Sequence, residues 1–191
     1  MLAGGLGLMA FHGGLEAGTA EIAEAAAAEA GASLYLVRQP AGLRWHVPSR
    51  SVRPAESHLL AAWLAHVDVA VALHGYGRIR QPRRILLGGT NRELAARLAS
   101  LMVPSLPGLA VITNLDDIEV ELRGLHPDNP VNLPSGGGVQ AELPPSARDR
   151  RLDPGAPDQV AWALAELARS WGTDAPSDTA AEPRRVLRRS R

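Results

Sequence analysis

One stretch near the N-terminus most constrains how this chain folds. The apolar run Leu6–Phe11 has the length and composition of a short buried strand, and Thr19–Ala30 is dense in the strong helix formers Ala and Glu. Only a short glycine-rich turn separates the two. We expect a helix that has Thr19 as its N-cap and stops at Gly31. A strand that passes directly into a helix is the building unit of α/β proteins.

The rest of the chain repeats this alternation of strands and helices. Apolar or alternating runs predict strands at 33–38, 44–47, 67–73, 84–87, 108–113, 116–123 and 139–143, and helical spacing predicts helices at 55–66, 91–102 and 158–171 with a helical turn at 146–151. Val67–Leu73 is apolar almost throughout, as a central strand covered on both faces should be. We therefore predict a single α/β domain over residues 1–171, an open mixed sheet flanked by helices. Residues 172–191, rich in Pro, Ser, Asp and Arg, are predicted to be a disordered tail.

Composition excludes several classes of function. The 20 basic and 20 acidic residues balance, so nothing favours electrostatic capture of nucleic acid or of an anionic membrane. The chain has no cysteine, which leaves His and carboxylate as zinc ligands, and no lysine, which excludes Schiff-base and P-loop chemistry. No apolar run approaches the roughly 20 residues that span a bilayer, and Met1–Gly5 lacks the basic start of a signal peptide. We expect a cytoplasmic protein, and the sequence does not indicate its oligomeric state.

Two histidines and a glutamate lie at the ends of predicted strands. His12 and Glu16 are four residues apart across a glycine turn, and His74 follows Val67–Leu73 directly and precedes Gly75. Open α/β sheets collect ligands at the carboxyl ends of their strands, so we expect the three side chains at one edge. Two imidazoles and a carboxylate make a three-ligand zinc site with an open position, as in catalytic sites. The alternatives are structural: histidines hydrogen-bonded in turns, and a Glu16 that complements the dipole of the helix start.

Glu142 is the candidate general base. It lies in the predicted strand Val139–Leu143, where alternation places it on the same face as Gln140. In a covered sheet, a partly apolar setting would raise the pKa of this carboxyl group and suit it to take a proton from a zinc-activated water. The alternative is an edge strand with one solvated face.

Arginine and amide side chains are candidates for binding a substrate. Guanidinium groups pair with carboxylates through two parallel hydrogen bonds. The arginines considered are Arg50, Arg53, Arg78 and Arg148. Arg78 and Arg148 are the better anchors for a substrate carboxylate. Gln140, Asn129 and Asn132 are candidates for hydrogen bonds to a substrate, although the two asparagines also fit a role in shaping turns.

Two further patterns receive structural interpretations. Gly5–Ala10 matches G-x-G-x-x-A, but no strand precedes it and no helix follows, so the context of a dinucleotide-binding motif is missing. His46 and His58 are expected on the surface rather than in the cleft.

Taken in order, these motifs resemble those of the poly-γ-glutamate hydrolase family. The blocks are His12–Thr19 (HGGLEAGT), Val71–Tyr76 (VALHGY), Gly88-Gly89, Asn129–Asn132 (NPVN), Gly137–Leu143 (GGVQAEL) and Arg148. The resemblance implies an open-sheet α/β fold related to the zinc carboxypeptidases, with a zinc ion held by His12, Glu16 and His74. It also implies that Glu142 is the base. The substrate would be a small or peptide-like molecule with carboxylates, cleaved at a γ-glutamyl or related amide bond.

The first motif is one residue shorter than the HGGGIE usual in that family. Deleting one residue from a turn displaces the carboxylate by up to about 3.5 Å. Two functions therefore stay open: a zinc-dependent amidohydrolase, and a non-catalytic α/β binding protein with a degenerate site. They differ in whether the Glu16 carboxylate converges with the two histidines on one point.

Overall fold

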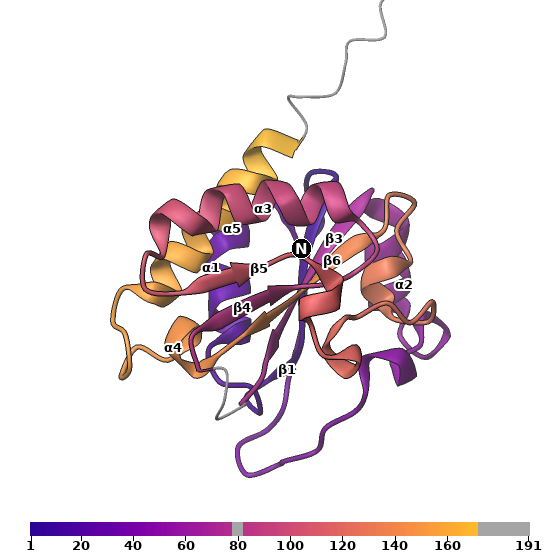
Figure 1. Ribbon diagram of the computed structural model, residues 1–191. Coiled ribbons are helices and arrows are strands. Elements are labelled where there is room, and N and C mark those ends of the chain that lie inside the picture. The colour runs from indigo at the N-terminus through magenta and orange to yellow at the C-terminus, as the bar shows by residue number, and fades with distance from the viewer. Residues whose placement is uncertain (78–81, 172–191) are drawn as a thin grey trace, which may run out of the picture.

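Six strands form one mixed sheet in the computed structural model, which describes residues 1–77 and 82–171 (Figure 1). The strands are β1 (Leu6–Gly13), β2 (Ser33–Arg38), β3 (Val69–Gly75), β4 (Arg84–Leu87), β5 (Ala110–Ile112) and β6 (Gly138–Leu143). Their order across the sheet is β2-β1-β3-β6-β4-β5. Neighbouring strands are parallel except β4 and β6, which are antiparallel. The predicted open mixed sheet of an α/β fold is thus confirmed.

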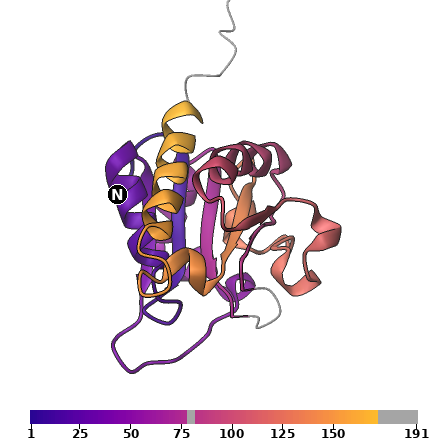
Figure 2. The same cartoon turned by 60° about the vertical axis from the view of Figure 1, so that its left-hand side comes forward.

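Helices cover both faces of the sheet. They are α1 (Thr19–Ala30), α2 (His58–His66), α3 (Arg92–Ser105), α4 (Pro145–Arg148) and α5 (Ala156–Trp171), and short 3-10 turns lie at Ser49–Ser51, Pro54–Glu56, Leu115–Asp117, Val120–Leu122 and Pro130–Asn132. On one face, α1, α3 and α5 bury a large core with β1, β3 and β6. In the turned view α5 lies along α1 in front of the strands (Figure 2). On the other face, α2 packs a smaller core through Leu60 and Trp63.

Trp63 shows how the smaller core depends on a glycine in the central sheet. The ring is 1% exposed and packs over β1. A Cβ atom at Gly7 would lie only 2.2 Å from the ring of Trp63 and 2.8 Å from a methyl group of Val67. Only glycine fits at position 7, because the Cβ atom of any other residue would overlap the indole.

Two predicted strands are wrong, and local hydrogen bonds explain why. Residues 44–47 form no strand, because the side-chain amide of Gln39 accepts the Trp45 N–H and donates to the Trp45 carbonyl. Residues 116–123 form 3-10 turns instead of an edge strand, and the Asn114 carboxamide caps the first turn by accepting the Asp116 N–H. Side chains that bind nearby backbone groups compete with strand pairing in this way.

Two predictions concern parts of the chain that the structure does not describe. The predicted tail 172–191 and the candidate anchor Arg78 lie outside the described residues. Within residues 1–77 and 82–171, no helix is long and apolar enough to cross a membrane.

The contact between Gly7 and Trp63 leads to a prediction about stability. Replacement of Gly7 by Ala should lower the melting temperature by about 2–12 °C, because overpacking costs about 1–3 kcal/mol and each kcal/mol is worth about 2–4 °C in a domain of this size. Gly77→Ala is the control, since no atom of residues 1–77 and 82–171 beyond its chain neighbours lies within 4 Å of a Cβ atom there. Thermal unfolding followed by circular dichroism measures both. Equal shifts for the two variants would contradict this packing argument.

Candidate metal centre

An irregularity in β1 orients His12. Along β1 and β2, Ala10 pairs with Leu36 and Gly13 with Arg38, so three steps on β1 oppose two on β2. Strict alternation would put His12 on the face of Ala10, but an extra residue in a strand re-aims the side chains next to it. The rings of Phe11 and His12, although consecutive, both lie beside His74, with centroids 6.3 and 5.2 Å from its ring.

The shortened turn after β1 closes tightly on itself. The N–H groups of Leu15 and Glu16 both donate to the His12 carbonyl, at 3.0 and 2.8 Å, and Gly14 supplies a left-handed backbone (φ 89°). The helix begins at Thr19 with Gly18 as its N-cap, so the expectation that Thr19 caps the helix is wrong. The Thr19 hydroxyl donates instead to the Glu16 carbonyl, at 2.8 Å. Glu16 therefore precedes the helix and is not an acid of its first turn.

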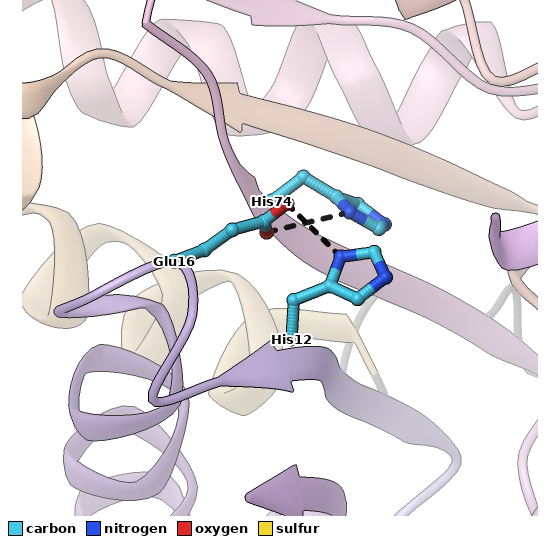
Figure 3. A group of neighbouring side chains, drawn as sticks. All are labelled: His12, Glu16 and His74. Atoms are coloured by element: carbon cyan, nitrogen blue, oxygen red, sulfur yellow. Dashed lines mark ion pairs between the residues drawn. The ribbon is translucent and has the colours of Figure 1, made fainter. Parts of the chain in front are cut away.

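The side chains of His12, Glu16 and His74 point toward one another (Figure 3). Glu16 Oε1 lies 3.0 Å from His12 Nδ1, and Glu16 Oε2 lies 3.7 Å from His74 Nδ1. All three candidate ligand atoms lie within 4.8 Å of one another. Two ligands about 2.0–2.1 Å from a tetrahedral ion are about 3.3 Å apart, so the two spacings from Glu16, 3.0 and 3.7 Å, are close to those a zinc ion needs. The missing residue in the first motif does not keep Glu16 from converging with the histidines.

His12 has a buried nitrogen that fits a metal ligand. Its Nε2 lies 2.8 Å from the carbonyl oxygen of Val47, which only accepts hydrogen bonds, so Nε2 carries the proton. In the neutral ring Nδ1 then holds a free lone pair. Among the described residues this buried atom has no hydrogen-bond partner. A histidine whose second nitrogen donates to a carbonyl is a common arrangement in metal sites.

The surroundings of His74 and Glu16 set the protonation states of these two side chains. Burial lowers the pKa of His74 to about 4, which keeps its imidazole neutral, the form that binds metals. Burial alone would raise the pKa of Glu16, yet its pKa lies below the usual value, and the Gly75 N–H, which donates to Oε2 at 2.8 Å, stabilises the ionised form. The site thus combines neutral His74 with an ionised carboxylate.

Glu142 lies beside His74 on the neighbouring strand. The two residues are paired in the register of β3 and β6, and Glu142 is 4% exposed. Because β6 lies between β3 and β4, the alternative of a solvated edge strand is wrong. Burial, followed by the nearby charge of Glu16, raises the pKa of Glu142 to about 8.

The other predicted site residues are engaged in internal hydrogen bonds. Gln140 lines the cleft and donates to Glu142. Asn132 binds Thr90, Gly124 and His126 and does not line the cleft. The Arg148 guanidinium donates to the carbonyls of Leu143 and Ala17 and packs against Gly75, behind Glu16.

A cleft of about 660 Å³ opens over the three converging side chains. His46, expected on the surface, lines this cleft: its ring centroid is 4.5 Å from that of His12, and its Nε2 is 3.9 Å from Glu16 Oε1. Arg50 and Arg123 also line it. The sequence spacing of His46, Arg50 and Arg123 does not predict that they line the cleft, because long loops bring them there.

The fold and the converging side chains define an α/β protein with a candidate His–Glu–His metal site. A family model of poly-γ-glutamate hydrolases matches residues 3–157, and the chain belongs to that family. The resemblance stated from the sequence is therefore confirmed, and so is the expected class, a hydrolase family. Among curated proteins, the SPbeta prophage-derived UPF0714 protein YoqZ of Bacillus subtilis (strain 168) is 29% identical over 147 residues, 75% of this chain. The chain spans about half the length (50%) of that relative.

Solved structures share the fold. A bacteriophage poly-γ-glutamate hydrolase superposes with a TM-score of 0.63 at 26% identity, covering 87% of this chain and 86% of that one. Zinc-free YNDL matches with a TM-score of 0.66 at 21% identity, over 89% and 85% of the two chains. The N-acetylmuramoyl-L-alanine amidase AmiC2 of Nostoc punctiforme matches with a TM-score of 0.51 at 10% identity, over 90% and 99%. At such identities the last two show similarity of fold alone.

The raised pKa of Glu142 predicts a pH-dependent stability in the metal-free protein. Its pKa is about 8 in the folded chain and 4.5 without burial, so the folded state binds more protons between these values and stability falls as pH rises. Glu142→Gln cannot titrate and keeps an oxygen for Gln140. Its melting temperature should exceed that of the unchanged protein at pH 8 by about 3 °C or more, with a smaller excess at pH 5.

Thermal unfolding in the presence of a chelator measures this difference. Glu93→Gln, on an exposed carboxylate of α3, is the matched control, and its offset should be the same at both pH values. A Glu142→Gln offset that does not grow with pH would contradict the buried, protonated state of Glu142.

Proposed function

We propose that this chain is a zinc-dependent amidohydrolase that cleaves a γ-glutamyl or related amide bond. The observation that carries the proposal is the convergence of His12 Nδ1, the Glu16 carboxylate and His74 Nδ1 beside the buried Glu142. Family membership supports the reaction class. The donor set of two imidazoles and one carboxylate is one that zinc prefers in catalytic sites.

His12, Glu16 and His74 would hold the zinc ion, and Val47 would orient His12 through its carbonyl. When bound, zinc polarises the amide carbonyl and lowers the pKa of water toward 7. Glu142 takes a proton from the attacking water and delivers it to the nitrogen of the departing amine. Burial makes its carboxylate a stronger base than a solvated one, in line with this role.

A carboxylate-bearing substrate fits the charges of the cleft. Arg50 and Arg123 line it together with the proposed metal ligands. Arg50 is exposed, so its guanidinium is accessible to a substrate carboxylate. The Arg148 guanidinium already serves two backbone carbonyls, so Arg50 is the better anchor. The similar bacteriophage protein is named a poly-γ-glutamate hydrolase, which supports an acidic, γ-linked chain as substrate.

The alternative was a non-catalytic binding protein with a degenerate site. The shortened first motif favoured it, because a displaced Glu16 would leave two histidines without their third partner. Glu16 lies 3.0 Å from His12 Nδ1, and its side chain is 11% exposed. The shortened first motif therefore does not displace Glu16 from the two histidines. Hydrolysis accounts for the site better than a non-catalytic binding role.

Two substitutions separate metal binding from proton transfer. His74→Ala should lose both stoichiometric zinc and hydrolysis. Glu142→Ala should keep zinc but hydrolyse about 10²–10⁴ times more slowly, the usual contribution of a general base. His66→Ala, at the exposed end of α2, is the control and should change neither.

Zinc is measured by mass spectrometry of the purified protein. Hydrolysis is measured on poly-γ-glutamate beside a panel of N-acyl amino acids and peptides, with and without chelator. A protein without stoichiometric zinc, or a His74→Ala variant with undiminished hydrolysis, would overturn the proposal.

A further inference from the structure

A chain of three hydrogen bonds runs from the backbone to Glu142. The Val131 N–H donates to Asn129 Oδ1 at 3.4 Å, and Asn129 Nδ2 donates to Gln140 Oε1 at 2.7 Å. Gln140 Nε2 then donates to Glu142 Oε1 at 2.8 Å. The three side chains are 3%, 6% and 4% exposed. Such buried chains are fully oriented only if each member has a defined donor and a defined acceptor.

The first link fixes the direction of all the others. A backbone N–H can only donate, so the Asn129 oxygen must face Val131 and its NH₂ group must face Gln140. The Asn129 NH₂ group can only donate, so the Gln140 oxygen must face it. The Gln140 NH₂ group is thereby directed at Glu142, and no member of the chain can flip its amide without losing a bond.

The surroundings leave room for this amide and little else. Gly124 has a left-handed backbone (φ +64°), and a Cβ atom there would lie 2.6 Å from both Cβ and Oε1 of Gln140. Asn129 is held as the N-cap of the 3-10 turn Pro130–Asn132, whose Pro130 and Val131 are buried. Gln140 itself lies on the central strand β6. The 3-10 turn thus fixes Asn129 at one end of the hydrogen-bond chain, and strand β6 fixes Gln140 at the other.

We propose that Asn129 and Gln140 are positioning residues that fix the carboxylate of Glu142 for catalysis. The Gln140 amide holds Oε1 and leaves Oε2 as the oxygen that exchanges the proton with water and amine. This inference rests on the proposed function, in which Glu142 is the base. It replaces the expectation that Gln140 binds substrate with a role that acts through Glu142.

The proposal predicts what happens when a substitution at Asn129 makes the Gln140 amide turn round. In Asn129→Asp, the new carboxylate still accepts the Val131 N–H but can no longer donate to Gln140. The Gln140 amide then turns to donate to Asp and presents its oxygen to Glu142, which loses its donor. We expect kcat to fall about 10- to 100-fold, the worth of a hydrogen bond to a charged group, while KM and zinc content stay the same.

Asn91→Asp is the matched control. Asn91 is also an N-cap asparagine, its Oδ1 accepts the Leu94 N–H at 2.8 Å, and its Nδ2 donates to the Gly136 carbonyl at 2.9 Å. Its replacement removes one side-chain donor in the same way, but that donor bonds to Gly136 and not to a member of the hydrogen-bond chain. Its kcat should match that of the unchanged protein.

A double-mutant cycle shows whether Asn129 acts through Gln140. Gln140→Leu removes the donor to Glu142 and should lower kcat by a similar factor. Adding Asn129→Asp to Gln140→Leu should then lower kcat by less than twofold, because the link is already broken. If Asn129→Asp costs the same factor in both backgrounds, or raises KM rather than lowering kcat, the positioning role is overturned.

A second measurement keeps this inference separate from the proposed function. In metal-free, ¹⁵N-labelled protein, the Gln140 side-chain amide signal is assigned by its loss in Gln140→Leu. Both Asn129→Asp and Glu142→Ala should shift this signal, and Asn91→Asp should leave it in place. An unmoved signal would overturn the hydrogen-bond chain itself, whereas shifted signals in a protein that cleaves no amide would uphold the hydrogen-bond chain and overturn the proposed function together with the catalytic role that rests on it.

Discussion

One carboxylate, that of Glu16, joins two separate parts of the chain. Its two oxygens lie 3.0 and 3.7 Å from the imidazoles of His12 and His74, and one of them accepts the Gly75 N–H at the end of β3. Glu16 is therefore tied to β1 through its turn and to β3 through its side chain. Without a partner of positive or donor character, a carboxylate buried to this degree would carry a large free-energy cost. The geometry of the site thus depends on this one group.

Glycines allow these groups to come so close together. A Cβ atom at Gly75 would lie 2.7 Å from the Arg148 guanidinium and 3.0 Å from Glu16 Cβ, and one at Gly18 would lie 2.1 Å from the Arg148 carbonyl. Arg148 is thereby packed against the back of the site, where it hydrogen-bonds backbone carbonyls. The glycine after His74 is thus explained by close packing around the carboxylate, whereas Gly14, after His12, supplies the left-handed backbone of the turn.

Local sequence signals predicted most of the fold, and the failures have physical causes. The strands at Ser33–Arg38 and Arg84–Leu87 were predicted to the residue, because apolar runs bounded by glycine or turns define them. Predictions failed where a side chain binds nearby backbone, as Gln39 does at Trp45. Of the site, the meeting of His12, Glu16 and His74 followed from their places at strand ends. The bulge in β1 and the approach of His46 did not, because both depend on partners distant in the sequence.

The central claim is that two imidazoles and one carboxylate hold a zinc ion at this site. X-ray absorption spectroscopy of the zinc-loaded protein tests it most directly, because it reports the ligands of the ion itself. The account predicts only nitrogen and oxygen ligands, at about 2.0–2.2 Å, with the outer-shell scattering of two imidazole rings. In His12→Ala that scattering should fall to one ring or the zinc should be lost. A spectrum without imidazole scattering, or one that is unchanged in His12→Ala, would contradict the claim.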